Sequence, residues 1–351
     1  MRINYANKSM QRWIFQCTGL IKRGVFVVML IGCSGDPSET PATAESVDST
    51  LAEPTPPAGL RHWVTGEDAD AEVTPLGPGL ILMGGGGEPD EAFQWWRNLL
   101  AAGDVVVLRA SGSDGYNDYL FEDIGGVDSV ETLLVDTVEL ANDPYVINRI
   151  NRAEGVFLAG GDQWKYLSIW GGSGLQAALD KVMDRGGVLG GTSAGLAVLG
   201  ERAFSAENNS VTSDEALSDP YNIYMQFVDQ FLSVSDLKGH ITDSHFAERD
   251  RMGRLVGFLA RMWEEGFEQP RGIGVDEATA MLLGPSGRSV VGMGAVYELK
   301  PTRAPERCVP GEPLNWESIS VTRHTAEGSI SYSMSVVQGV LGASDGGPLY
   351  R

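Results

Sequence analysis

The sequence predicts an α/β fold with a mostly parallel sheet, helices on both of its faces and antiparallel hairpins near the C-terminus. Three observations support this. From about residue 74, short apolar runs alternate with amphipathic helical segments, several of the runs end in glycine-rich turns, and the last third changes to strand-like runs broken by glycines. Strands that alternate with helices indicate βαβ units and a sheet buried on both faces. Catalytic groups of such sheets lie at the carboxyl ends of the strands.

The expected elements follow from apolar periodicity and from the glycines between segments. The first buried strand, 80–83, ends in four consecutive glycines, 84–87. The helix expected over 250–265 carries an apolar stripe of Leu255, Phe258, Leu259 and Met262. The other expected helices cover 91–102, 144–153 and 175–185, and the other strands cover 104–109, 132–135, 155–159, 187–190, 273–275, 280–283 and 290–299.

The N-terminus, residues 1–33, predicts an export signal. Residues 1–23 are basic without an acidic residue, and a short apolar run over 25–31 precedes Gly32 and Cys33. The run is shorter than the ~20 residues that span a membrane. Leu30–Cys33 resembles a bacterial lipobox, which implies lipidation of Cys33; an ordinary signal peptide is the alternative. We therefore expect an exported chain, either secreted or anchored to the cell envelope.

Composition divides the remainder into a linker and one folded domain. Residues 34–58 are rich in Ser, Thr, Pro, Ala and acidic residues and have almost no bulky apolar side chains, which is typical of disorder. We expect a disordered linker over 34–72 and a catalytic domain over 73–351.

Charge and residue counts exclude several function classes. The chain has 26 Lys and Arg against 47 Asp and Glu, a net charge of −21, which argues against nucleic-acid binding because phosphates require clustered cations. Its three cysteines and four histidines show no metal-ligand spacing. We therefore expect no metal and no organic cofactor, and any membrane contact only through a lipid anchor.

The segment Gly191-Thr192-Ser193-Ala194-Gly195 fits the nucleophile-elbow pattern. Small neighbours permit a tight strand-to-helix turn that exposes the serine hydroxyl. The N–H of Ala194, at the start of the following helix, would point at a developing oxyanion, and we expect the N–H of Gly161 to assist it. The alternative is a glycine-rich turn with a buried serine.

Three further motifs surround the elbow in a fixed order. They are Ala153–Gln163 (AEGVFLAGGDQ), Thr242–Phe246 (TDSHF) with the arginines at 249, 251 and 254, and Gly272–Ala280 (GIGVDEATA). Together with GGTSAG, they make the chain resemble the cyanophycinase family of serine peptidases, relatives of dipeptidase E with a flavodoxin-type, class I glutamine-amidotransferase-like fold. The resemblance covers about residues 78–300.

The resemblance implies roles for these residues. Ser193 is expected to be the nucleophile, His245 its base and Glu277 the acid that orients the histidine, with Glu207, Asp214 and Glu215 left open as rivals for the acid. The family cleaves cyanophycin, a poly-aspartate with arginine branches, to β-Asp-Arg dipeptides. The residues expected to bind the peptide substrate are Gln163, Asp243, Ser244, Arg249, Arg251 and Arg254.

Chemistry supports these roles. A serine hydroxyl needs a base to take its proton, and a carboxylate that fixes the histidine tautomer. Arginine forks suit substrate carboxylates, although a solvated helix face with ion pairs would also explain the three arginines. Two rivals remain: an α/β-hydrolase using Ser193, Asp276 and His324 with the glycines at 84–87 as oxyanion hole, and a non-catalytic surface binding protein on the same scaffold. A homodimer is also considered.

Overall fold

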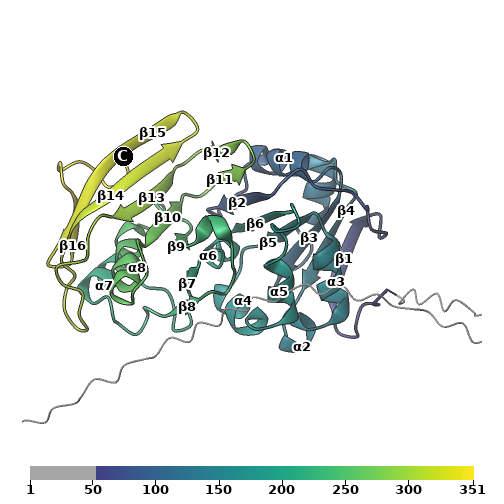
Figure 1. Ribbon diagram of the computed structural model, residues 1–351, viewed down its shortest axis with the longest axis horizontal. Coiled ribbons are helices and arrows are strands. Elements are labelled where there is room, and N and C mark those ends of the chain that lie inside the picture. The colour runs from purple at the N-terminus through teal and green to yellow at the C-terminus, as the bar shows by residue number, and fades with distance from the viewer. Residues whose placement is uncertain (1–52) are drawn as a thin grey trace, which may run out of the picture. The chain divides into compact units, whose positions relative to one another are not determined.

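Two eight-stranded sheets organise residues 53–351, the part of the chain that the computed structural model describes (Figure 1). The first has the order β1-β4-β3-β5-β6-β2-β11-β12, and its five central strands, from β4 to β2, are parallel. The antiparallel strands β1, β11 and β12 lie at its two edges. The strands are β1 Arg61–Gly66, β2 Gly79–Met83, β3 Asp104–Arg109, β4 Ser129–Leu134, β5 Gly155–Leu158, β6 Val188–Thr192, β11 Thr279–Gly284 and β12 Gly287–Gly292.

The second sheet has the order β16-β15-β14-β13-β10-β9-β7-β8. Only β7, β9 and β10 pair in parallel, and the remaining pairs are antiparallel. Its strands are β7 Arg202–Phe204, β8 Phe227–Asp229, β9 His240–Asp243, β10 Arg271–Val275, β13 Val296–Pro301, β14 Trp316–Thr325, β15 Gly328–Val337 and β16 Val340–Ala343.

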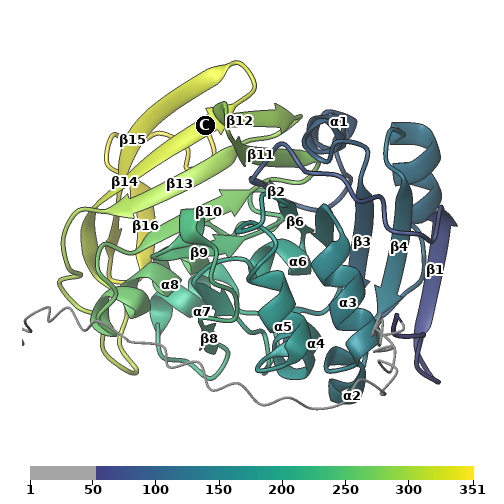
Figure 2. The same cartoon turned by 45° about the vertical axis from the view of Figure 1, so that its right-hand side comes forward.

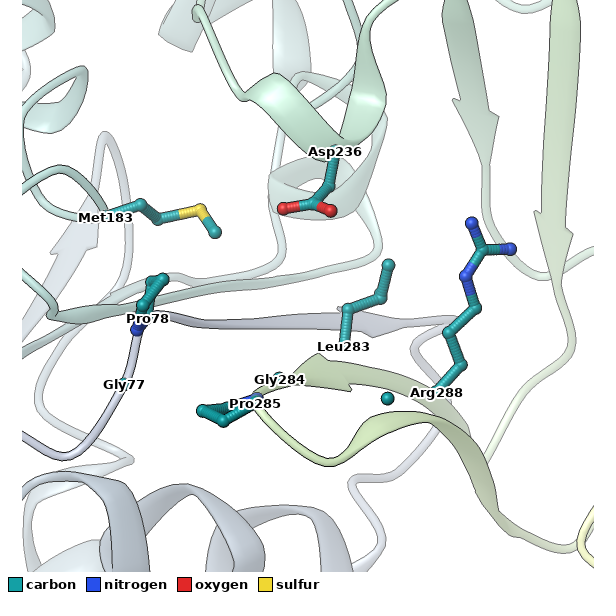
Figure 3. Close-up of a pocket in the computed structure, with 9 residues that line it drawn as sticks. Gly77, Pro78, Met183, Asp236, Leu283, Gly284, Pro285 and Arg288 are labelled. Atoms are coloured by element: carbon teal, nitrogen blue, oxygen red, sulfur yellow. The ribbon is translucent and has the colours of Figure 1, made fainter.

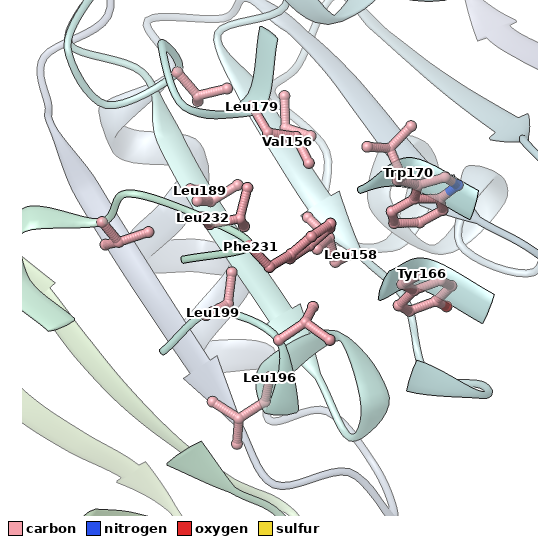
Figure 4. Close-up of a cluster of buried hydrophobic side chains, with 14 of the residues drawn as sticks. Val156, Leu158, Tyr166, Trp170, Leu179, Leu189, Leu196, Leu199, Phe231 and Leu232 are labelled. Carbon is pink, nitrogen blue, oxygen red and sulfur yellow. The ribbon is translucent and has the colours of Figure 1, made fainter. Parts of the chain in front are cut away.

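Helices cover both faces of the first sheet because its strands are apolar on both sides. Along β2, Leu80 and Leu82 pack with the side of α3 to α6, whereas Ile81 and Met83 pack with α1 and η1. Figure 4 shows part of the first cluster, which includes Leu158 of β5, Leu189 of β6 and Leu196 of α6. The helices are α1 Asp90–Leu99, η1 Tyr119–Ile124, α2 Val138–Ala141, α3 Pro144–Arg152, α4 Gln163–Trp170, α5 Gly174–Leu179, α6 Ala194–Ala197, α7 Ser213–Ser218, η2 Ser235–Leu237 and α8 Met252–Glu264.

The second sheet has its own core. The buried stripe of α8 packs with inward-facing residues of β13 to β15, among them Tyr297, Trp316 and Met334. The chain passes from this sheet to the first between the end of β10 and the start of β11, through residues 276–278. That short crossing brings the carboxyl ends of β9 and β10 next to the first sheet.

The α/β class is confirmed, and most expected elements fall within a few residues of those observed. The strand expected over 104–109 is β3, and the helix over 250–265 is α8. The run over 290–299 is two strands, β12 and β13, which belong to different sheets. The sequence indicated hairpins near the C-terminus, but not that they form a second sheet.

The linker expected over 34–72 is wrong at its C-terminal end. Residues 61–66 form β1, which pairs along its whole length with β4. Asn117 Nδ2 donates to the carbonyl of Trp63, and His62 Nδ1 lies 2.8 Å from Glu131 Oε1. The sequence did not predict this strand because it lies at the edge of the sheet, where its half-buried side chains do not produce a strong apolar pattern.

The expected export signal and Cys33 lie outside the described residues. Within residues 53–351, no helix combines the length and apolar character needed to cross a bilayer.

Candidate active site

Ser193 occupies a sharp turn between β6 and α6. Its backbone is in the left-handed half of conformational space, with φ 52° and ψ −112°, where a non-glycine residue is held only by its surroundings. The glycines on either side are required by space. A Cβ on Gly191 would lie 2.6 Å from the carbonyl carbon of Gly195, and one on Gly195 would lie 2.0 Å from the oxygen of Leu158.

A continuous series of hydrogen bonds joins Ser193, His245 and Glu277. The Oγ of Ser193 lies 2.7 Å from Nε2 of His245, and Nδ1 of His245 lies 2.6 Å from Oε1 of Glu277. His245 is 7% exposed, whereas a third of the Glu277 side chain reaches solvent. With Nδ1–H donating to Glu277, Nε2 is free to accept the serine proton.

The two sheets supply these residues jointly. Ser193 follows β6 of the first sheet, whereas His245 and Glu277 follow β9 and β10, which are neighbouring parallel strands of the second. Helix α6 contacts both β6 and β9 where the sheets meet (Figure 2). Because parallel strands end at the same edge, the two partners of the hydrogen-bond series are adjacent although they are 32 residues apart.

The glycines at 84–87 hold this junction together. The carbonyl of Gly84 accepts from His245 N at 2.9 Å, and that of Gly85 accepts from Ala278 N at 2.9 Å. A Cβ on Gly85, whose φ is +87°, would lie 2.6 Å from Cε1 of His245 and 3.0 Å from Cβ of Ser193. Sequence reasoning assigned these glycines only to the α/β-hydrolase alternative. Four consecutive glycines directly after a buried strand were the sequence signal that the backbone here lies close to other groups.

Burial lowers the pKa of His245 below its ordinary value. The hydrogen bond to Glu277 opposes that shift, while the positive charges of Arg249 and Arg251 add to it. The imidazole is therefore neutral near pH 7, which is the form that a general base requires.

Asp276 ties the segment of Glu277 to its surroundings. Its two carboxylate oxygens accept from the backbone N–H groups of Ala247 and Ala295, both at 2.9 Å. Burial raises the pKa of Asp276 to about 6. The backbone N–H of the next residue, Glu277, donates to Oε2 of Glu248. Both oxygens of Asp276 are therefore engaged with backbone groups, and Glu277, not Asp276, bonds to His245.

The two N–H groups expected to bind an oxyanion are available. Neither Gly161 N nor Ala194 N donates a hydrogen bond within residues 53–351, as expected for Ala194 at the first turn of a helix. The adjacent Gly160 also lies against the elbow, since a Cβ there would be 3.5 Å from Cβ of Ser193.

Two of the expected substrate-binding residues form a buried ion pair instead. Arg254 is 3% exposed and Asp243 is 2% exposed, and Nε and Nη2 of Arg254 donate to the two oxygens of Asp243, with 2.7 Å for the Nε bond. The remaining nitrogen, Nη1, donates to Ser210 and Val211. The prediction that these two side chains contact substrate is wrong in this arrangement, because a buried charge needs its partners inside the protein.

The other expected substrate-binding residues fall into two groups. Arg251 donates to the carbonyl of Ser244 at 2.7 Å, and Ser244 is buried, so both are engaged within the protein. Gln163 is half-buried and donates to the carbonyl of Phe204. Arg249 is exposed, and no carboxylate among residues 53–351 forms an ion pair with it.

The rival residues lie away from the serine. His324 is in β14, and its Nδ1 bonds to Ser329 Oγ at 2.7 Å. Glu207, Asp214 and Glu215 are exposed, and Glu215 forms a capping box with Thr212. None of these four takes part in the hydrogen-bond series of Ser193.

Several hollows among residues 53–351 are not lined by Ser193. One of about 440 Å³ lies at the other end of β2, where the side chains of Asp236 and Arg288 face it across Leu283 (Figure 3). Among residues 53–351, no three His, Cys, Asp or Glu side chains gather as metal ligands.

Comparisons with known proteins place these features in a family context. The profile of peptidase family S51 matches residues 109–284, which is half of the chain. The chain is 30% identical over 188 residues to the cyanophycinase of Synechococcus elongatus, with 53% of each chain covered. It is also 30% identical over 186 residues to the cyanophycinase of Trichormus variabilis, covering 52% of this chain and 57% of that one. The chain thus spans about half the length of the curated relatives it matches.

A solved structure shares the fold. A peptidase from an acI-B1 actinobacterium superposes with a TM-score of 0.50 at 18% identity, covering 74% of this chain and 99% of the other. At that identity, the likeness concerns the fold alone.

Proposed function

The chain belongs to peptidase family S51, and we propose that it is a serine peptidase whose nucleophile is Ser193. The observation that carries the proposal is the hydrogen-bonded series from Ser193 through His245 to Glu277, which begins at a strained elbow. In this proposal His245 is the general base and Glu277 fixes its tautomer.

The reaction is acyl transfer in two steps. Ser193 Oγ attacks the scissile carbonyl carbon while His245 Nε2 takes the hydroxyl proton, and the amine leaves after receiving that proton from the imidazolium. Water, activated by the same histidine, then adds to the ester and releases the acid together with free Ser193. The carboxylate of Glu277 stabilises the imidazolium that exists between proton transfers.

The free N–H groups of Ala194 and Gly161 are proposed to bind the oxyanion. Ala194 follows the nucleophile and Gly161 follows Gly160, which lies against the elbow, and neither N–H has a partner among the described residues. The N–H of Ala194 also begins α6, although a helix of only four residues adds little dipole of its own. Each donor in such a hole is worth about 10²–10³ in rate.

We propose cyanophycin or related aspartyl peptides as the substrate, cleaved to dipeptides of the β-Asp-Arg type. The support is the family, the names of the relatives and the exposed, unpaired Arg249 beside His245. A guanidinium is a forked donor that suits a carboxylate on the substrate. Arg251 and Arg254 act here by holding the segment that carries His245, through Asp243 and Ser244.

Fluorophosphonate labelling tests the catalytic proposal. We expect stoichiometric modification of Ser193 in the wild type, none in Ser193→Ala and greatly slowed labelling in His245→Ala. His324→Ala is the matched control and should label at the wild-type rate. A wild-type protein that is not labelled, but binds Asp/Arg-rich peptides, would be a binding protein on this scaffold.

Product analysis tests the substrate. Incubation with purified cyanophycin and, separately, with isoaspartyl dipeptides, followed by mass spectrometry, should show β-Asp-Arg from cyanophycin in the wild type and not in Ser193→Ala. Labelling of Ser193 without release of this dipeptide would refute the substrate and leave the peptidase chemistry intact.

Export, with Cys33 as lipid attachment site, is a further part of the proposal and rests on the sequence of residues 1–33. Cell fractionation of the wild type and of Cys33→Ser tests it. The anchor requires that the wild type be found with membranes and that the variant be released from them.

A further inference from the structure

The segment that carries His245 is held in a strained conformation at both ends. His245 has φ 46° and Asp250 has φ 48°, values that cost a non-glycine residue free energy unless neighbouring groups hold it. Between them the turn closes on itself, since Arg249 N donates to His245 O and Arg251 N donates to Phe246 O. The groups that pack on this turn therefore decide where Nε2 of His245 lies.

Tyr350, which follows the last strand of the second sheet, contacts this turn. Its hydroxyl donates to Oδ1 of Asp250 at 3.0 Å and accepts from the backbone N–H of Met252 at 2.7 Å. Its ring packs edge-on against Phe246, with centroids 6.0 Å apart, and against Tyr297 at 5.8 Å. It thus contacts the residue after His245, the second strained residue and the first residue of α8.

The contact with Met252 replaces a missing helix cap. Arg251, the residue before α8, provides no side-chain hydrogen bond to the helix. The first N–H groups of a helix need outside acceptors, and here Tyr350 serves Met252 while Oγ of Ser213 serves Arg254 at 3.1 Å. The start of α8 is therefore fixed by residues distant in sequence.

Tyr350 is itself anchored to the second sheet. The hydroxyl of Tyr332, in β15, donates to the carbonyl of Leu349. The guanidinium of Arg351 lies over the ring of Tyr332 at 4.1 Å and pairs with Asp345 at 2.8 Å. Residues 349–351 are thus held on both sides of Tyr350.

We propose that Tyr350 is a positioning residue for His245, holding the 245–251 turn so that the imidazole stays within reach of Ser193. This rests on the proposed function of Ser193 and His245. Tyr350 follows the last strand of the second sheet and lies outside residues 109–284, which the family profile matches, so this chain fixes its base with a segment that the family match does not include. Burial raises the pKa of the Tyr350 hydroxyl, which keeps it a donor to Asp250 at every pH at which the enzyme would work.

Tyr350→Phe keeps the ring and removes the hydroxyl, and Tyr350→Ala removes both. Because a small misplacement of a catalytic group costs up to about 100-fold, we expect fluorophosphonate labelling to slow about 10-fold in the first and about 100-fold in the second. With substrate, kcat should fall while KM changes little. Tyr145→Phe is the matched control: it breaks a similar tyrosine–carboxylate bond, of 2.8 Å to Glu131 on β4, and should label at the wild-type rate.

Hydrogen exchange gives a readout that does not depend on activity. Amides of residues 245–252 should exchange faster in Tyr350→Phe than in the wild type and be unchanged in Tyr145→Phe. If the wild type is not labelled, the function of Ser193 fails, and exchange still decides the positioning role. Unchanged exchange in both Tyr350 variants, or wild-type labelling with only a lowered Tm, would overturn the proposal.

Discussion

Replacing Glu277 by Gln isolates the contribution of the carboxylate behind His245. The side chain keeps its size, but the 2.6 Å hydrogen bond to Nδ1 loses its charge. An amide can also donate to Nδ1, which would move the imidazole proton to Nε2 and leave no acceptor for the serine proton. Both effects act on the step in which His245 takes the proton of Ser193.

The structure sets the size of the expected loss. In serine proteases with a buried carboxylate, the same change costs about 10⁴ in rate. Here a third of the Glu277 side chain is exposed, so water replaces part of the lost interaction and screens the rest. We therefore expect a loss of about 10²–10³, equivalent to about 2.7–4 kcal/mol at 1.36 kcal/mol for each factor of ten.

The pH dependence of activity gives a second, independent test of the role of Glu277. Activity is lost as the pH falls through the pKa of His245, because only the neutral imidazole accepts a proton. Burial already lowers that pKa, and the bond to Glu277 opposes the shift. Removing the negative charge should lower the pKa further, so the acid limb of the variant moves to lower pH while its plateau falls.

The assay is the second-order rate constant of fluorophosphonate labelling of Ser193, measured across the pH range that the folded protein tolerates. Glu207→Gln is the control, since Glu207 is an exposed carboxylate outside the hydrogen-bond series, and it should behave as the wild type. A Glu277→Gln protein with the wild-type rate and an unmoved acid limb would refute the role of Glu277.

Four other changes test separate parts of the structure. Gly85→Ala places a Cβ 2.6 Å from Cε1 of His245 at a φ of +87°, so labelling of Ser193 should slow at least about tenfold while the Tm, measured calorimetrically, falls only slightly; wild-type labelling would contradict the close approach. Arg254→Met leaves Asp243 buried without its partner and should cost about 3–5 kcal/mol in urea unfolding, and the double variant with Asp243→Asn should recover much of this loss if the cause is the uncompensated charge. Arg249→Ala removes an exposed side chain and should change stability by less than about 0.5 kcal/mol while raising KM for cyanophycin; an unchanged KM would remove Arg249 from the substrate site. Deleting residues 1–72 removes β1 and uncovers the edge of β4, so its Tm should fall below that of a protein lacking residues 1–52, and equal values would show that β1 adds no stability.

Much of the first sheet could be predicted because its signals are local. The runs at 80–83, 104–109 and 155–158 are short, apolar and bounded by turn residues, and such a pattern has few structural solutions other than a buried strand. The elbow at Ser193 could be predicted equally well, because its glycines are required by contacts within a few residues of the turn and with the neighbouring strand.

The second sheet was not predictable in the same way. Strands β14 and β15 were not among the expected elements, and buried positions alternate with more exposed ones over only part of each strand. β1 was missed because an edge strand needs little apolar character. The two roles assigned to Asp243 and Arg254 failed because a charge near a catalytic motif has the same sequence signature whether it faces substrate or another charge.

The sequence by itself determined the α/β class, the serine elbow and, through the order of its motifs, the histidine and acid proposed to serve it. These depend on short-range patterns and on a family resemblance. Only the tertiary structure decided that Glu277 and not Glu207, Asp214 or Glu215 reaches His245, and that Asp243 and Arg254 pair with each other. It also decided that Tyr350 packs on the turn of His245. The physical reason is that these contacts join residues brought together by the order of the strands and by the contact between the two sheets. The spacing of residues along the chain determines neither the strand order nor that contact.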